Sequence, residues 1–187
     1  MTAPLVIVGC GVAGYALLRA LRQVDRRRPV LLITADDGAA YAKFGLARAL
    51  AHGREARALV LATAEQMAYR YDATIVTQRR IVRIDRSCRE LVAHGGRYAY
   101  DQLVLATGTS PRRQALRGTA AERMLTLDTL ADYAYLRSEL AGRRRIVVAG
   151  GGIAGCELAD NLARAGCDVT LLEPANRLLA GTVPTLT

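Results

Sequence analysis

The chain has 187 residues, of which 51% are hydrophobic and 23% charged, and its formal net charge at pH 7 is +9. This composition is typical of a folded globular protein and excludes a disordered or low-complexity chain. Apolar runs are too short for a membrane span, and the first one lacks the basic flank and the length of a secretory signal, so we expect a cytoplasmic protein.

Arginine supplies almost all of the positive charge. The sequence has 26 basic against 17 acidic residues, and Lys43 is its only lysine. Two interpretations of this balance are possible: arginines on an ordinary solvated surface, or a more specific docking face for an acidic protein partner. The arginines are scattered and no aromatic platform accompanies them, which argues against nucleic-acid binding.

The four cysteines form neither a C-x-x-C nor a C-x-x-x-x-C pair. The spacing therefore gives no sign of a redox dithiol, a zinc site or another metal site. Cys10 and Cys156 stand in glycine-rich segments, where we expect them to act as small packing residues.

The first motif joins an apolar strand to a glycine-rich turn. Leu5–Val8 is uncharged and apolar, as in a buried strand of a parallel sheet, and Val12–Val24 has apolar residues at helical spacing. Between them, Gly9, Gly11 and Gly14 form G-x-G-x-x-G. The first glycine permits a tight turn, the second lets a pyrophosphate approach the backbone, and the third lets the helix pack close to the strand. The segment thus predicts a dinucleotide-binding corner whose helix N-terminus offers N–H groups to phosphates.

A second apolar strand, Val30–Ile33, ends close to two acidic residues. In a dinucleotide fold, an acid at this point binds the adenosine ribose. Asp36 or Asp37 fits that role, and the alternative is that the two acids before Gly38 only form a turn.

The middle of the chain contains short alternating elements. A loop and a helix are expected over residues 40–50, closed by His52 and Gly53, and Thr63 is the expected N-cap of a helix that ends near Arg70. Short strands are expected at residues 59–62, 73–77, 80–85, 90–93, 97–100 and 103–105. The small residues Ala106, Thr107 and Gly108 follow the last strand and let the backbone approach a flat ligand.

A second strand–turn–helix unit follows a polar linker at residues 112–123. Thr126 or Asp128 is the expected N-cap of a helix that ends near Ala141. Next come a strand at residues 146–149, a repeat of the glycine motif, a helix at 156–165, and a strand at 169–172. The repeated motif consists of Gly150, Gly152 and Gly155.

Glu173 directly follows the last of these strands. An acid at this point favours a ribose with a free 2′-hydroxyl, and hence NAD over NADP. Two dinucleotide corners in one chain imply two bound nucleotides. The simplest reaction that uses both is hydride transfer from NADH to a flavin.

These features resemble the FAD-dependent pyridine nucleotide-disulphide oxidoreductases. The resemblance is carried by the two corners, by residues 103–112 (L-V-L-A-T-G-x-x-P-R) and by residues 150–157 (G-G-G-I-A-G-C-E). Residues 33–43, I-T-A-D-D-G-x-x-Y-x-K, are similar to the rubredoxin–NAD reductase branch. The resemblance implies an α/β fold with two Rossmann-like units of the FAD/NAD(P)-binding three-layer ββα type, both incomplete in this chain. The implied domains are an FAD-binding domain at residues 1–115, without its returning strand, and the first half of an NAD-binding domain at residues 116–187.

The same resemblance assigns cofactor-binding roles and no catalytic side chain. It assigns FAD to Gly9, Gly11, Ala13, Gly14, Thr34, Ala35, Lys43, Ile81, Ala106, Thr107 and Gly108. Within this set, Thr34 and Ala35 meet the adenosine ribose, and Ile81 meets the adenine through its backbone. NADH is assigned to Gly150, Gly152, Gly155 and Glu173, and Glu157 reaches the flavin region.

The implied activity is electron transfer from NADH through FAD to rubredoxin or a similar acidic carrier. The alternatives are a non-catalytic nucleotide-binding fragment and a sibling reductase that serves a [2Fe–2S] ferredoxin or oxygen. Phe44 replaces the proline that usually follows the lysine of the Y-x-K stretch, which is expected to reshape the loop over the flavin. The chain also stops at Thr187, before the family's returning strand and C-terminal interface domain, so we expect it to hold flavin weakly or not at all.

Overall fold

The structure, a computed structural model, describes residues 3–111, 117–119 and 121–184. It contains two compact units: Met1–Ala42 with Val60–Ser110, and Lys43–Leu59 with Pro111–Thr187. The expected domain limits, 1–115 and 116–187, stay a prediction, and the compact units differ from them by grouping Lys43–Leu59 with the second unit. Of the expected linker at residues 112–123, residues 112–116 and 120 lie outside the described residues.

The first unit is built on a four-stranded sheet in the order β5-β2-β1-β9. All of its strand pairs are parallel. Val8, the last residue of β1, pairs with Ile33 on one side and Leu105 on the other, so three strands end at the same edge. The strands are β1 Leu5–Val8, β2 Val30–Ile33, β5 Thr74–Val76 and β9 Gln102–Leu105.

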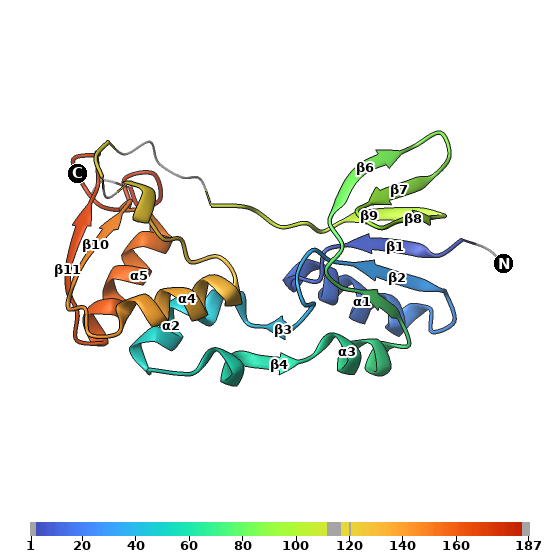
Figure 1. Cartoon of the computed structure of the whole chain (residues 1–187), viewed down its shortest axis with the longest axis horizontal. Helices are drawn as coiled ribbons and strands as arrows, with labels where there is room; N and C mark the ends of the chain where they lie inside the picture. Colours follow the sequence, from blue (N-terminus) through green and yellow to red (C-terminus); the bar gives the residue numbers. More distant parts are fainter. Residues whose placement is uncertain (1–2, 112–116, 120, 185–187) are drawn as a thin grey trace. The chain divides into compact units, whose positions relative to one another are not determined.

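Helices cover one face of this sheet and an antiparallel meander covers the other (Figure 1). The helices are α1 Val12–Val24 and α3 Ala64–Tyr71. The meander consists of β6 Ile81–Asp85, β7 Glu90–Ala93 and β8 Gly96–Ala99. A further short pair, β3 Ala40–Tyr41 and β4 Val60–Ala62, is antiparallel.

The first strand is apolar throughout because both of its faces are buried. Leu5 and Ile7 belong to the core cluster that includes Leu18 of α1 and Met67 of α3. Val6 and Val8 face the opposite way, into the cluster that contains Leu91 of the meander. Helix, sheet and meander therefore form three layers, and the expected Rossmann-like α/β class is confirmed.

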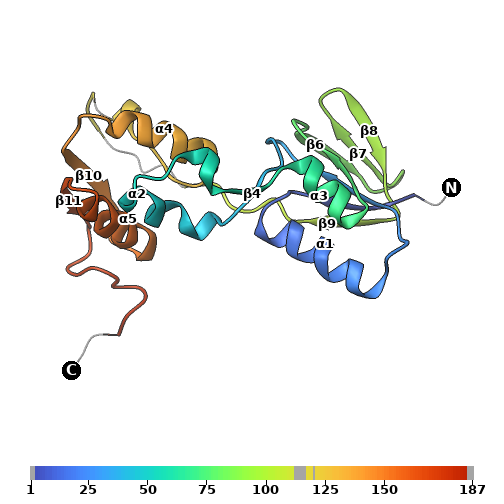
Figure 2. The same ribbon diagram turned by 90° about the horizontal axis from the view of Figure 1, so that it is seen from below.

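The second unit contains a two-stranded parallel sheet with helices packed beside it (Figure 2). Its strands are β10 Arg145–Ala149 and β11 Asp168–Leu172, and its helices are α2 Leu46–Ala51, α4 Leu130–Leu140 and α5 Ile153–Arg164. Short 3₁₀ turns occupy Lys43–Gly45, Ala56–Leu59 and Ala121–Arg123. Alternate strand residues point inward, where Val148 is buried, while Val147 and Leu172 remain 64% and 51% exposed.

The expected elements are confirmed, with shifts at two helix starts. The helix of the second glycine unit begins at Ile153 rather than residue 156, because Gly152 of the motif is itself the N-cap. Helix α4 is capped by Thr129, and the expectation of Thr126 or Asp128 was wrong. Thr129 and Asp132 form a reciprocal capping box that neither alternative forms: the Asp132 N–H donates to Thr129 Oγ1 at 3.0 Å, and the Thr129 N–H donates to the Asp132 carboxylate at 2.9 Å.

Within the part of the chain that the structure describes, none of the helices combines the length and the apolar character that crossing a bilayer requires.

Replacement of Thr129 by alanine removes this capping box. We expect Thr129→Ala to lower the free energy of unfolding by about 1 kcal/mol, because it leaves the N–H of Asp132 without its acceptor. Urea unfolding followed by circular dichroism measures the change. Thr126→Ala is the matched control, with an expected loss below about half of that value. Equal losses in the two variants contradict the assignment of Thr129 as the cap.

Candidate functional site

The turn after β1 requires glycine at its first position. The N–H of Gly9 donates to the Ile33 carbonyl at 2.8 Å, which extends the parallel pairing into the turn. Gly9 then adopts φ = +110°, a conformation that side chains rarely tolerate. A methyl group at this position would also overlap the carbonyl of Ala106, at the end of β9. Gly9 therefore brings the turn against the segment that follows β9.

The other two motif glycines have different surroundings. A methyl group on Gly14 would overlap the carbonyl of Gly9, so the first turn of α1 can lie against the strand end only without a side chain there. Gly11 is exposed, and no neighbouring atom lies within 4 Å of the place where its Cβ would stand. The protein's own packing thus explains Gly9 and Gly14, whereas Gly11 leaves open space beside the backbone that a ligand can fill.

The second corner repeats this geometry in its own unit. Gly150 adopts φ = +111°, and its N–H donates to the Leu172 carbonyl of β11 at 2.8 Å. A methyl group on Gly155 would overlap the Gly150 carbonyl, while the Cβ position of Gly152 has no atom within 4 Å. In both motifs the first glycine follows the strand end, the second leaves open space, and the third allows the close contact with the helix.

The helices of the two corners begin without a side-chain cap. Helices α1 and α5 start after Gly11 and Gly152, with neither a capping side chain nor an acid in the first turn. By contrast, α3 and α4 begin with complete capping boxes at Thr63 and Thr129. The first-turn N–H groups of α1 and α5 are therefore left for another acceptor, and the positive end of each helix favours an anion. This cradle fits the pyrophosphate of a dinucleotide.

The residues expected to border the first corner lie at the same sheet edge. Thr34 and Ala35 follow β2, and Ala106 follows β9, with its N–H donating to the Val8 carbonyl at 2.8 Å. Thr107 and Gly108 continue from there on the exposed side. The structure thus brings these residues to the glycine turn, and their contact with a cofactor stays a prediction.

The acids after β2 have turn-forming partners. The carboxylate of Asp36 accepts the Thr34 hydroxyl at 2.6 Å and the Gly38 N–H at 3.0 Å. The carboxylate of Asp37 accepts the Ala39 N–H at 3.0 Å. Of the two interpretations of these acids, the contacts favour the turn.

Ile81 and Lys43 have different surroundings from one another. The side chain of Ile81 packs against the core cluster that contains Val8, and its backbone lies opposite Ala93 in the β6–β7 ladder. Lys43 belongs to the second unit, where its Nζ lies 2.7 Å from Oδ1 of Asp128. That partner lies far along the chain, and sequence reasoning did not identify it.

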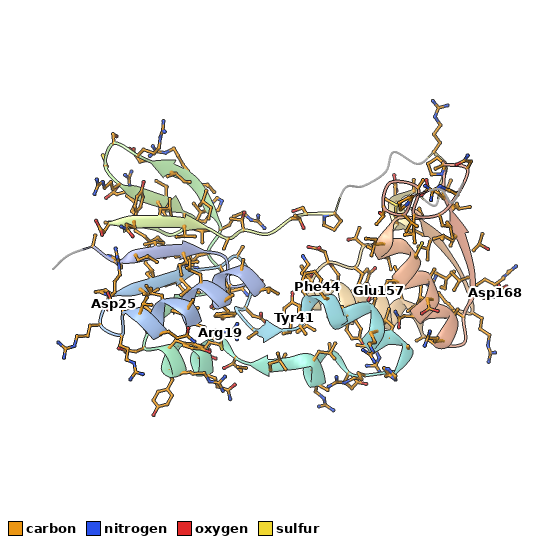
Figure 3. All side chains as sticks on the ribbon, turned by 180° about the vertical axis from the view of Figure 1, so that it is seen from behind. Arg19, Asp25, Tyr41, Phe44, Glu157 and Asp168 are labelled. Atoms are coloured by element: carbon orange, nitrogen blue, oxygen red, sulfur yellow. The ribbon has the colours of Figure 1, made fainter. Side chains whose placement is uncertain are left out.

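Two further residues of the second unit lie on its surface. Glu157 is exposed on α5, and its backbone carbonyl accepts the Asn161 side-chain amide at 2.8 Å (Figure 3). Phe44, the residue that departs from the family pattern, is 82% exposed. Exposure leaves both side chains accessible to ligands.

The carboxylate of Glu173 is fixed by two backbone amides. Its Oε1 accepts the Ala175 N–H at 2.9 Å, and its Oε2 accepts the Gly151 N–H at 2.6 Å. These hydrogen bonds, with that from Ala175 the larger cause, hold the pKa of Glu173 below its usual range. The acid is thus ionised at neutral pH beside the second glycine turn. Sequence reasoning missed Gly151, although the run of three consecutive glycines was a visible signal.

The first corner contains a buried thiol. Cys10 is 5% exposed and belongs to the core cluster, which confirms its interpretation as a packing residue. Burial raises the pKa of this thiol to about 11, so it is uncharged at neutral pH. Nearby, the hydroxyl of Tyr15 donates to the Gly38 carbonyl at 2.5 Å and ties α1 to the loop after β2.

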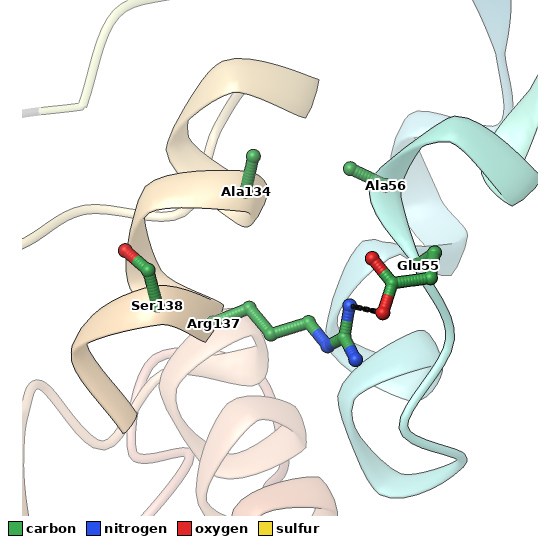
Figure 4. A pocket seen from close by; sticks show the side chains of 5 residues that line it. All are labelled: Glu55, Ala56, Ala134, Arg137 and Ser138. Atoms are coloured by element: carbon green, nitrogen blue, oxygen red, sulfur yellow. Dashed lines mark ion pairs between the residues drawn. The ribbon is translucent and has the colours of Figure 1, made fainter. Parts of the chain in front are cut away.

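The second unit contains a cavity of about 340 Å³ whose lining includes none of the motif glycines (Figure 4). Its lining includes Glu55 and Arg137, whose charged groups pair with each other at 2.7 Å. This pairing engages both charged groups of that lining. A second cavity of the same unit, of about 520 Å³, is bordered by Arg137, Arg143 and Arg144. Within the described ranges, no cluster of three or more His, Cys, Asp and Glu side chains is arranged to hold a metal ion.

A model of the pyridine nucleotide-disulphide oxidoreductase family matches residues 3–186. The chain therefore belongs to this family, whose members bind FAD and NAD(P), and the resemblance inferred from the sequence is confirmed.

Individual proteins give the similarity in detail. The chain is 34% identical over 184 residues to the nitric oxide reductase FlRd-NAD(+) reductase of Vibrio vulnificus, covering 98% of the chain and 48% of that protein. It is 33% identical over 181 residues to the rubredoxin-NAD(+) reductase of Alcanivorax borkumensis, covering 97% and 47%. A ferredoxin reductase structure from Rhodopseudomonas palustris matches with a TM-score of 0.87 and 28% identity, covering 98% of this chain and 45% of that one. The chain spans about half the length of the curated relatives it matches.

The two kinds of motif glycine can be separated experimentally. We expect Gly14→Ala to lower the free energy of unfolding of the first unit by more than about 2 kcal/mol, because the new methyl group overlaps the Gly9 carbonyl. Gly11→Ala adds a methyl group in open space and is expected to cost less than about 1 kcal/mol. Urea unfolding measures both changes. A Gly11→Ala variant as unstable as Gly14→Ala would show that Gly11 is there for packing.

Proposed function

We propose that the chain forms the FAD-binding part, and the first part of the NAD-binding domain, of a reductase that passes electrons from NADH through FAD to rubredoxin or a similar small acidic carrier. The observation that carries this proposal is the pair of uncapped glycine corners with matching geometry in a chain of this family. When bound, FAD supplies the chemistry that links a two-electron hydride donor to a single-electron acceptor. The protein supplies the binding and the orientation.

The first corner is proposed to hold FAD. The N–H groups at the start of α1 suit the pyrophosphate, and Gly11 leaves room for it to approach. Thr34 and Ala35 border the same turn on one side and suit the ribose, while the segment that begins at Ala106 borders it on the other. The backbone of Ile81 and the ammonium of Lys43 complete the proposed FAD contacts, with Ala13, Gly9, Gly14, Thr107 and Gly108.

The second corner is proposed to hold NADH. Gly150, Gly152 and Gly155 form the cradle, and the Glu173 carboxylate lies next to it in its ionised form. A carboxylate accepts hydrogen bonds from ribose hydroxyls and repels a 2′-phosphate, so the site favours NADH over NADPH. Glu157, exposed on the helix that leaves this corner, is the proposed contact toward the flavin.

Three observations favour a protein electron carrier as the acceptor. The relatives named above are NAD(+) reductases of rubredoxin and FlRd, and the matched structure is a ferredoxin reductase. The formal charge of +9 complements an acidic carrier. The four cysteines contain no C-x-x-C pair of the kind that a disulphide reductase uses to relay electrons.

Corner-specific variants test the assignment of the two cofactors. We expect Gly11→Ala to weaken FAD binding by about tenfold or more and to leave NADH binding unchanged, because the methyl group blocks the approach of the pyrophosphate. Gly152→Ala is expected to do the reverse. Fluorescence titration of the purified chain with each nucleotide measures both constants, and Gly181→Ala, in open space outside both motifs, is the control. If either variant weakens both nucleotides equally, the assignment of one nucleotide to each corner fails.

Carrier reduction tests the acceptor. Because we expect this chain to hold flavin weakly, the assay contains FAD in excess together with NADH. Under these conditions we expect reduction of rubredoxin to be faster than that of a [2Fe–2S] ferredoxin, and we expect the rate to fall as salt screens the attraction between unlike charges. Stopped-flow absorbance of the carrier measures this rate. Faster reduction of ferredoxin than of rubredoxin would instead indicate a ferredoxin reductase. Binding of both nucleotides without reduction of either carrier would support a non-catalytic nucleotide-binding role.

A further inference from the structure

Gly151 stands between the first two glycines of the second motif and makes the shorter of the two hydrogen bonds to Glu173. It is buried, and its N–H donates to Glu173 Oε2 at 2.6 Å. The dinucleotide motif as derived from the sequence leaves this position unrestricted. In the structure, however, Gly151 directly contacts Glu173, the acid proposed to bind the ribose.

Space, rather than backbone conformation, requires glycine here. A Cβ atom on Gly151 would lie 2.7 Å from Cδ2 of Leu178 and 2.9 Å from both Cβ and Oε2 of Glu173. The backbone of Gly151 is outside the left-handed region, so an alanine would be conformationally acceptable. Any side chain at this position therefore displaces the Glu173 carboxylate, the Leu178 side chain, or both.

The carbonyl of Gly151 fixes two neighbouring segments. It accepts the Leu179 N–H at 2.8 Å and the thiol of Cys156, in the first turn of α5, at 3.4 Å. The chain that follows Glu173 is thus tied back to the glycine turn, on the side where Leu178 fills the space that Gly151 leaves. Gly151 sets the position of the acid through its N–H and supports the following segment through its carbonyl.

The first corner provides an internal comparison. There, Cys10 takes the place of Gly151, between the first two motif glycines. The strand beside it is followed by Thr34, whose side chain is smaller than that of Glu173 and carries no charge. The corner with the larger acid has the smaller residue in the turn, as expected if the two positions share one volume.

We infer that Gly151 is a positioning residue for Glu173 and that the preference of the second corner for NADH over NADPH depends on it. The inference rests on the proposed binding of NADH at this corner. Each Glu173 oxygen accepts one backbone N–H and keeps a lone pair for a ribose hydroxyl, which is the arrangement that an unphosphorylated ribose needs. A side chain at position 151 disturbs this arrangement and leaves the phosphate cradle of Gly150, Gly152 and Gly155 in place.

The test compares the affinities of the whole chain for NADH and NADPH, measured by nicotinamide fluorescence titration. We expect Gly151→Ala to weaken NADH binding by about tenfold, the value of a charged hydrogen bond, and to change NADPH binding by less than about threefold. The Kd for NADPH divided by the Kd for NADH therefore falls toward one. A merely structural defect lowers both affinities together and leaves their ratio unchanged.

Two controls keep the test decisive. Gly181→Ala, with open space at its Cβ position, should leave the ratio unchanged. The double variant Gly151→Ala with Leu178→Ala removes the clash with leucine and keeps the clash with Glu173. It should therefore still lower the Kd for NADPH divided by the Kd for NADH, even if the single variant folds poorly.

The outcomes separate this inference from the proposed function. If the Gly151→Ala variant has the same ratio of Kd for NADPH to Kd for NADH as the unsubstituted protein, the inference is overturned. The proposed NADH site is not affected by that result. An unsubstituted chain that binds neither nucleotide, or prefers NADPH, overturns both the proposed NADH site and the inference built on it.

Discussion

The close contact between the backbone carbonyl of one glycine and the α-carbon of another determines how each strand meets its helix. Gly9 and Gly14 make this contact in the first unit, and Gly150 and Gly155 make it in the second. Because no side chain separates them, the helix starts directly over the strand end, and its first N–H groups are held at the edge where the parallel strands finish. The direction of the helix, the open glycine beside it and the placement of the bordering loops all follow from this short approach.

The helices differ in how the N–H groups of their first turns are satisfied. Helices α3 and α4 satisfy theirs with a threonine and a residue three positions later, and these helices complete the packing of their units. Helices α1 and α5 begin on a glycine without such a cap. An uncapped start is not by itself a mark of a binding site, since α2 also begins on a glycine, Gly45. What sets α1 and α5 apart is that each start directly follows a strand end and a G-x-G-x-x-G turn, the arrangement that suits an anion.

Most of the fold could be predicted from the sequence because its signals are local. Leu5–Val8 is apolar on both faces, and Gly9, Gly11 and Gly14 keep a spacing that one turn geometry explains. The cap of α4 was missed because several residues of the right type stand together, and only the reciprocal bond with Asp132 distinguishes Thr129.

The interactions that could not be predicted join residues distant in the sequence. The ion pair between Lys43 and Asp128 is one example. The hydrogen bond from Gly151 to Glu173 is another, since it depends on how closely the turn approaches the end of β11.

At the second corner, Gly150 follows β10 and Glu173 follows β11. A ligand that contacts both the turn and the acid would therefore connect the ends of the two strands. A ladder of two strands is only marginally stable by itself, and a molecule that binds only its folded form stabilises it by mass action. The proposed binding of a nucleotide at this corner therefore also stabilises the pairing of β10 with β11.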